Sequence, residues 1–418
     1  MTMNTFSILF LIAVASAAFT RLWLASRHVN HVRTHRNSVP EPFAAEIALD
    51  AHQKAADYTV AKSLFSMAGI VFSTLVLLAL TFGGVLQNLY DLTGNFISVE
   101  LGRGLLFFAL LTLLMSLLDV PFDLYRTFVI EERFGFNKMT PGLFVRDLIV
   151  GLVVSAALGL PFLAVLLWLM GAAGESWWLY AWIAGVAFWL FVQFISPTVI
   201  APLFNKFSPL DNQELKQRIE NLLKRCGFQS KGLFVMDGSK RSSHGNAYFT
   251  GFGKSKRIVF FDTLVERHDG PEVEAVLAHE LGHFKLHHVL KLTAMFAVLG
   301  FVFFWLLGLA KNTSWLFTGL NVSYPASDAL VLTVFYLALP PFLFFVRPLL
   351  AAYLRKNEFE ADAYAAEYAP AKDLVRALVK LYKDNASTLT PDPLHSAFYD
   401  SHPPAAARIA RLQDLSKA

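Results

Sequence analysis

The feature that most constrains this chain is a series of apolar stretches, each long enough to cross a bilayer. Residues 64–86, 148–173 and 292–310 contain no Asp, Glu, Lys or Arg. A helix of about 20 apolar residues spans the roughly 30 Å hydrocarbon core of a membrane. Because 55% of all residues are hydrophobic and only 16% are charged, the chain is predicted to be a polytopic membrane protein rather than a soluble one.

Seven such stretches predict seven membrane helices. They cover residues 5–19, 64–86, 104–122, 148–173, 177–195, 292–310 and 329–346. The first stretch has no basic residue before its apolar run, which is the reverse of a signal peptide, so it is predicted to be a retained span. Pro340 and Pro341 are expected to kink the last span.

The basic residues predict the orientation of these spans. Loops one, three and five and the C-terminus carry the clusters of Lys and Arg, whereas the other loops are short or poor in basic residues. The positive-inside rule then places the N-terminus outside and the large polar loop on the cytosolic side of a bacterial inner membrane or the endoplasmic reticulum. This topology accounts for the formal net charge of +4 without any nucleic-acid partner.

One motif in the polar loop contains residues that can bind a metal and act as a general base. His279-Glu280-Leu281-Gly282-His283 lies in residues 271–288, which are predicted to form one helix with Asp269 and Gly270 as caps. Histidines four residues apart lie on one helical face, so both can bind one Zn²⁺, while Glu280 can reach a water on the metal as a general base. Gly282 is expected to leave room on the metal face.

A catalytic zinc site needs a third protein ligand. Val289 stands where a third histidine of the longer zinc-protease motif would be, and a single cysteine excludes a multi-cysteine site. Glu358 is the predicted ligand, and Asp362, four residues later, is predicted to accept a hydrogen bond from a ligand histidine. The alternative for Glu358 is a surface ion pair with Arg355.

Other nearby side chains are assigned no role in the metal site. His287 and His288 could offer nitrogens, but a site using His283 and His287 would abandon Glu280. Glu360 is predicted to be solvated or structural, and His244 and His395 are predicted to be structural.

Together these features predict a mainly α polytopic membrane fold with a small α+β zinc-protease segment. The predicted parts are residues 1–204 with five spans, 205–291 as the metallopeptidase segment, 292–346 with two spans, and 347–418 as a C-terminal helical segment. Within the metallopeptidase segment, residues 211–226 have helical periodicity, 232–237 and 257–262 are typical of short strands, and 246–250 is predicted to be an edge strand.

The motif residues resemble the type I CAAX prenyl endopeptidases, a family of membrane zinc proteases. The resemblance rests on Glu358-Phe-Glu-Ala-Asp362 after the histidine motif, and on residues 125–138, 200–206, 238–249 and 401–408. It implies seven membrane helices around a chamber, with the metallopeptidase site facing the interior. It also implies removal of the three C-terminal residues that follow a prenylated cysteine.

The same resemblance implies roles for three more residues. Asn246 matches the position that holds the substrate backbone beside the active site. His402 and Arg408 match a pair near the scissile bond, where His402 would be a catalytic residue that stabilises the oxyanion and Arg408 would bind substrate.

The resulting hypothesis is a metalloendopeptidase with one zinc per chain that acts on a prenylated C-terminal tail at the bilayer. Two alternatives remain. A quality-control protease of the HtpX-like type shares the zinc helices but is shorter, with fewer spans. A transporter or channel would use intramembrane polar residues such as Asp119 and Asp123, but it leaves the zinc residues unexplained.

Overall fold

The structure, a computed structural model, describes residues 3–230, 232–250 and 257–417. Within them, seven helices are long and apolar enough to cross a membrane, which confirms the predicted number of spans. Four of these are α1 (Thr5–Thr34), α2 (Leu49–Leu80), α5 (Pro141–Ala172) and α11 (His288–Lys311). The other three are Glu100–Glu131, which includes α4 (Glu100–Tyr125), Gly174–Phe204, which includes α6 (Trp177–Ile195), and Asp328–Tyr368, which includes α13 (Asp328–Leu343). Many large apolar side chains on them are exposed, as expected for surfaces that face lipid.

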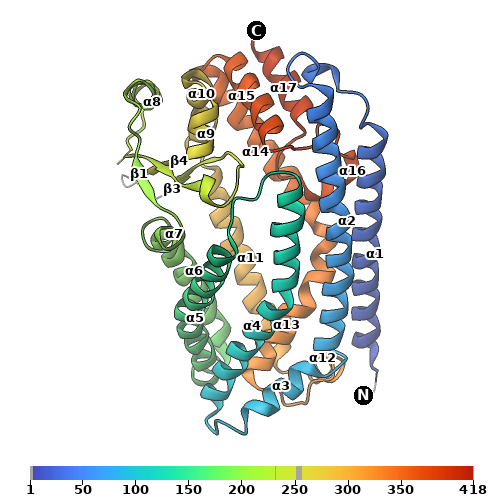
Figure 1. Ribbon diagram of the computed structural model, residues 1–418. Coiled ribbons are helices and arrows are strands. Elements are labelled where there is room, and N and C mark those ends of the chain that lie inside the picture. Colours follow the sequence, from blue (N-terminus) through green and yellow to red (C-terminus); the bar gives the residue numbers. More distant parts are fainter. Residues whose placement is uncertain (1–2, 231, 251–256, 418) are drawn as a thin grey trace.

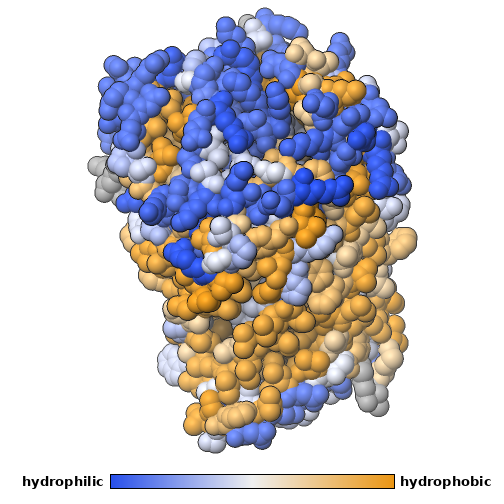
Figure 2. Space-filling view, in the orientation of Figure 1, coloured by the Kyte–Doolittle hydropathy of each residue, from blue (hydrophilic) through white to orange (hydrophobic). Residues whose placement is uncertain are grey.

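The membrane helices form one half of an elongated molecule (Figure 1). The N-terminus lies at the far end of this half and the C-terminus at the opposite end of the molecule. Figure 2 shows an apolar surface over the membrane helices and a hydrophilic surface over the other half. An odd number of spans accounts for the separation of the two termini.

The bundle is closed at its N-terminal end by α3 (Val85–Thr93) and α12 (Ser314–Thr318). Leu86 and Tyr90 of α3 and Phe317 of α12 belong to one buried apolar cluster, together with residues of α1, α4, α5, α11 and α13. Nearer the polar half, the helices surround inner cavities of about 460, 530 and 550 Å³. The cavities near the N-terminal end are smaller, about 220 and 310 Å³, so the larger hollow spaces lie toward the polar half.

The third span extends beyond its predicted end. The span was predicted to end at residue 122, but α4, which contains Pro121, continues to Tyr125 and a π-helical turn follows at Arg126–Glu131. Proline in a membrane helix is tolerated where neighbouring groups and local π adjustments satisfy the backbone. The charged residues of this stretch are thus held on a continuous helix.

The polar half contains a four-stranded sheet with the order β1-β2-β4-β3. Its strands are β1 (Phe207–Pro209), β2 (Leu233–Met236), β3 (Ala247–Thr250) and β4 (Arg257–Phe261). β3 pairs antiparallel with β4 and is at the edge, as its sequence predicts. The short β1, which the sequence analysis did not identify, closes the other edge.

The other elements of the polar half are helices, several of which form a second core with the sheet. They are α8 (Gln213–Arg225), α9 (Asp262–Arg267), α10 (Gly270–Lys285), α14 (Arg347–Tyr368), α15 (Ala371–Asp384), α16 (Pro393–Tyr399) and α17 (Ala405–Leu415). Buried apolar residues of α8, β4, α10, α14 and α15 form one cluster. The C-terminal helices therefore pack directly on the helix that carries His279 and His283.

Candidate active site

The helix that carries the histidine motif begins where its sequence predicts. The side chain of Asp269 accepts a hydrogen bond from the backbone N–H of Glu272, and Glu272 bonds back to the N–H of Asp269, which completes a capping box. The helix ends at Lys285, however, and not at His288. His287 has a left-handed φ of 59°, so the chain turns there and His288 begins α11.

Gly282 has a different role from the one predicted. A Cβ at Gly282 would lie 3.0 Å from the Cα of Ala361 and 3.2 Å from the Cβ of Tyr364. The missing side chain therefore gives room to the backbone of α14 rather than to the metal. This close approach of α10 and α14 brings Glu358 to the two histidines.

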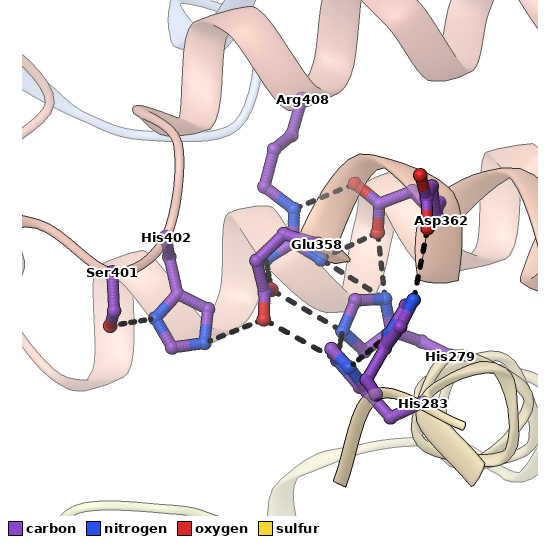
Figure 3. Close-up of polar contacts among 9 residues, drawn as sticks. His279, His283, Glu358, Asp362, Ser401, His402 and Arg408 are labelled. Carbon is purple, nitrogen blue, oxygen red and sulfur yellow. Dashed lines mark hydrogen bonds and ion pairs between the residues drawn. The ribbon is translucent and has the colours of Figure 1, made fainter. Parts of the chain in front are cut away.

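Three side chains from these two helices converge (Figure 3). The Nε2 atoms of His279 and His283 lie 3.3 Å apart. Glu358 places one carboxylate oxygen 3.5 Å from His279 Nε2 and the other 3.3 Å from His283 Nε2. Two nitrogen ligands about 2.05 Å from a tetrahedral zinc are about 3.3 Å apart, so the donor set has the spacing that a metal requires.

The surroundings of these donors also suit a metal. Glu358 Oε2 is buried and has no hydrogen-bond partner within the described residues. His279 Nδ1 lies 2.8 Å from Asp362, the contact predicted from the sequence, so Nε2 remains for a metal. Burial by itself would lower the pKa of His279, but its close contacts with the carboxylates of Asp362 and Glu358 outweigh burial and raise the pKa to about 9. A metal at Nε2 therefore competes with a proton.

His283 is held by a side chain that the sequence analysis left without a role. His283 Nδ1 lies 3.0 Å from His288 Nδ1, and His288 Nε2 lies 3.0 Å from Glu360. His288 is buried. The chain of contacts from Glu360 through His288 orients the His283 ring. The available signal was the pair of extra histidines directly after the motif.

The competing interpretation of Glu358 is not supported. Arg355 donates hydrogen bonds to the backbone oxygens of Ser396, Ala397 and Asp400. Its guanidinium thus holds the C-terminal segment, and Glu358 faces the histidines.

A cavity of about 460 Å³ lies over these residues. Glu280, His283, Glu358 and His402 line it, as do Tyr248 and Phe249 of β3. Desolvation raises the pKa of the Glu280 carboxyl, which brings a general base closer to neutral pH.

The three remaining predicted site residues, His402, Arg408 and Asn246, differ in their exposure and contacts. His402 is exposed and lies 3.4 Å from Glu358, whereas Arg408 is buried and bonds to both carboxylate oxygens of Asp362 (Figure 3). Asn246 is exposed directly before β3, and its side chain accepts a hydrogen bond from the N–H of Ala247. In this conformation Arg408 supports the metal-site residues, and its contact with substrate stays a prediction.

Comparisons with known proteins agree with this geometry. Residues 28–206 match the family model described as CAAX prenyl protease N-terminal, five membrane helices, and residues 209–416 match peptidase family M48. The chain is 36% identical to the CAAX prenyl protease 1 homolog of Arabidopsis thaliana, with 91% of each chain covered. It is 34% identical to the human homolog, with 94% of this chain and 91% of the relative covered. The chain belongs to the CAAX prenyl protease 1 family of M48 peptidases.

A solved structure extends this similarity to the whole fold of the chain. The crystal structure of S. mikatae Ste24p superimposes with a TM-score of 0.93 at 30% identity and covers 98% of this chain and 100% of its own. This chain is thus a multi-pass membrane metalloendopeptidase, and its family implies a bound metal. The transporter and channel hypothesis is excluded, and the full-length match favours this family over shorter quality-control proteases.

Proposed function

We propose that this membrane peptidase removes the three C-terminal residues that follow a prenylated cysteine. The observation that carries the proposal is the convergence of His279, His283 and Glu358 beside Glu280, in a cavity that also reaches the membrane helices. Gln193 of α6 and Leu292 of α11 line the same cavity. A substrate that carries a lipid can therefore approach the catalytic residues from the bundle.

In this proposal His279, His283 and Glu358 hold one zinc ion per chain. When bound, zinc polarises the scissile carbonyl and lowers the pKa of the attacking water. Glu280 takes a proton from that water and passes it to the leaving amine. His402, exposed at the cavity, donates a hydrogen bond to the oxyanion. Asp362 and Arg408 keep His279 in the tautomer that leaves Nε2 free.

The substrate tail binds along β3. A peptide can add to a free sheet edge, where main-chain hydrogen bonds give affinity and pockets give specificity. Tyr248 and Phe249 bring this edge to the active-site cavity, and Asn246 is exposed where the strand begins. Asn246 then orients the substrate backbone, and Asn246→Ala should weaken cleavage without releasing the metal.

Prenylated peptides are expected to be cut far better than matched bare peptides. Apolar side chains from α11 and α14, including Val289, Leu292 and Leu354, line the cavity. Each CH₂ group of an isoprenoid buried there contributes about 0.8 kcal/mol, so the difference in kcat/KM should reach several powers of ten. Product masses for farnesylated and bare C-a-a-X peptides give both the rate and the cleavage position. Equal cleavage of the two, or cleavage elsewhere, would indicate a general membrane peptidase.

The active site is proposed to face the cytosol of the inner-membrane or reticulum bilayer. The support is the one-sided distribution of Lys and Arg, combined with the opposite positions of the two termini (Figure 1). Reporter fusions after Ser208 and after Ala418 are expected to read cytosolic, and a reporter inserted between residues 311 and 328 should read external. The reversed pattern would refute this orientation, whatever the enzyme's activity.

A further inference from the structure

A second cavity lies next to the segment that leads into β3. Its volume is about 550 Å³, and it is bounded by α2, the end of α4 with its π-helical turn, the start of α5 and residues 241–244. Ser242 and His244 line this cavity, whereas Tyr248 and Phe249 line the active-site cavity. Residues 241–246, which we call the entry segment, lead into β3. The entry segment and β3 therefore run from the second cavity to the active-site cavity.

The entry segment is held in a fixed position. Asn385, at the end of α15, accepts a hydrogen bond from the N–H of Gly245 at 3.1 Å, and the same oxygen lies 3.2 Å from His244 Nδ1. His244 Nδ1 therefore carries a proton. His244 Nε2 lies 3.7 Å from Glu131, which also accepts a hydrogen bond from Tyr58. Both nitrogens of His244 and the Glu131 carboxylate are thus engaged by protein groups.

The remaining charges in the cavity wall leave two cations available. Arg241 is paired with Asp147 at 2.8 Å. Lys62 of α2 and Arg126 are exposed, and within the described ranges neither has a carboxylate oxygen within 4.0 Å. Lys62 lies 3.8 Å from the centre of the Tyr58 ring.

One more carboxylate belongs to this wall. Asp123 lies three residues before Arg126 on the same helical surface and offsets part of its charge. The wall thus holds three cations, Lys62, Arg126 and Arg241, and three carboxylates, Asp123, Glu131 and Asp147. Within the described residues, Lys62 and Arg126 are the two of these cations that lack a carboxylate oxygen within 4.0 Å. Ionisable groups on membrane helices are costly and usually serve a function.

A peptide that pairs with β3 would bring its C-terminal carboxylate toward these two cations. Among the described residues, β3 pairs only with β4, so they leave its other edge free. A substrate strand that adds in the more stable antiparallel direction runs toward the start of β3, with its C-terminus approaching His244. At about 3.3 Å per residue, three residues extend about 10 Å, and the four residues from Tyr248 back to His244 extend about 13 Å. A carboxylate three residues beyond a scissile bond held opposite Tyr248 thus ends within about one residue's length of His244, next to the second cavity.

We propose that Lys62 and Arg126 bind the C-terminal carboxylate of the substrate and thereby set how many residues are removed. The proposal rests on the proposed function, because it takes the substrate to be a peptide tail along β3. It accounts for two intramembrane cations that the catalytic site does not use.

The test compares farnesylated peptides that end in a free carboxylate with the same peptides ending in an amide. For the full-length enzyme, amidation should lower kcat/KM about 10–100-fold, mainly through KM, because hydrogen bonds between charged groups are the stronger ones. The double variant K62M/R126M should cut the acid as slowly as the amide and show no preference between them. The matched control K54M/R133M removes one cation from α2 and one from the residues just after the turn Arg126–Glu131. Neither residue lines the cavity, so this variant should keep the preference for the acid.

The outcomes separate this proposal from the proposed function. Equal cleavage of acid and amide by the unaltered enzyme would overturn the carboxylate site while leaving prenyl-peptide cleavage intact, and this result does not depend on any variant folding. A preference for the acid that survives in K62M/R126M would overturn it as well. If the unaltered enzyme cuts neither farnesylated peptide, both proposals fail.

Discussion

Glu280→Gln is expected to lower kcat by roughly 10²–10⁴-fold, the usual contribution of a positioned general base. The amide of glutamine has nearly the same shape as the carboxylate but cannot take a proton from the attacking water. Glu280 lines the cavity beside His283 and Glu358 without being one of the three converging donors. Metal content and thermal stability should therefore stay close to those of the unaltered enzyme. The measurements are kcat on a farnesylated peptide and metal per chain by elemental analysis.

A matched control is Glu266→Gln, which makes the same change on an exposed residue of α9. It should leave kcat unchanged. Near-normal hydrolysis by Glu280→Gln would mean that another group activates the water, whereas loss of metal together with activity would mean that Glu280 is needed to build the site.

Glu358→Ala should abolish both metal binding and activity. It removes one of three proposed ligands, so the loss in metal affinity should exceed the 10–100-fold that follows loss of a partner behind the ligands. It also leaves His279 and His283 with two facing Nε2 atoms 3.3 Å apart and no α14 carboxylate opposite those Nε2 atoms, because Asp362 contacts His279 Nδ1. Zinc affinity by competition with a chelator and cleavage of a prenylated peptide should fall together.

Glu367→Ala is the matched control, because Glu367 is an exposed carboxylate on the same helix. It should retain zinc and activity. Full metal occupancy in a folded Glu358→Ala protein, judged by its melting temperature and helical content, would refute the ligand assignment and require a different third ligand.

Most of the fold follows from local patterns in the chain. The seven spans were predictable because a bilayer demands long uncharged runs, and such runs are visible without knowing what packs on them. The start of α10 was predictable for a similar reason, since Asp269 and Glu272 cap neighbouring backbone groups. The predicted ends of α4 and α10 were less accurate, because π-helical bonding after Tyr125 and a left-handed residue at His287 depend on surrounding structure.

The chemistry of the site was also predictable in part. Histidines four apart with an intervening glutamate define a metal-binding face from helix geometry alone, and Glu358 with Asp362 forms another such face. The purpose of Gly282 was not predictable, because a gap on one helix has no meaning until α14 is placed against it. The support of His283 by His288 and Glu360 links residues 72 positions apart and has no local signature.

The sequence by itself determined that this chain crosses a membrane seven times and presents a zinc-protease motif on a capped helix. Those properties depend on hydrophobicity, helical period and capping, which act between residues close in the chain. Tertiary structure alone decided how close α14 comes to α10, that Arg408 bonds to Asp362, and that β3 and the segment before it line two neighbouring cavities. These depend on packing and charge pairing between distant segments, and such contacts exist only after the helices and the sheet have assembled.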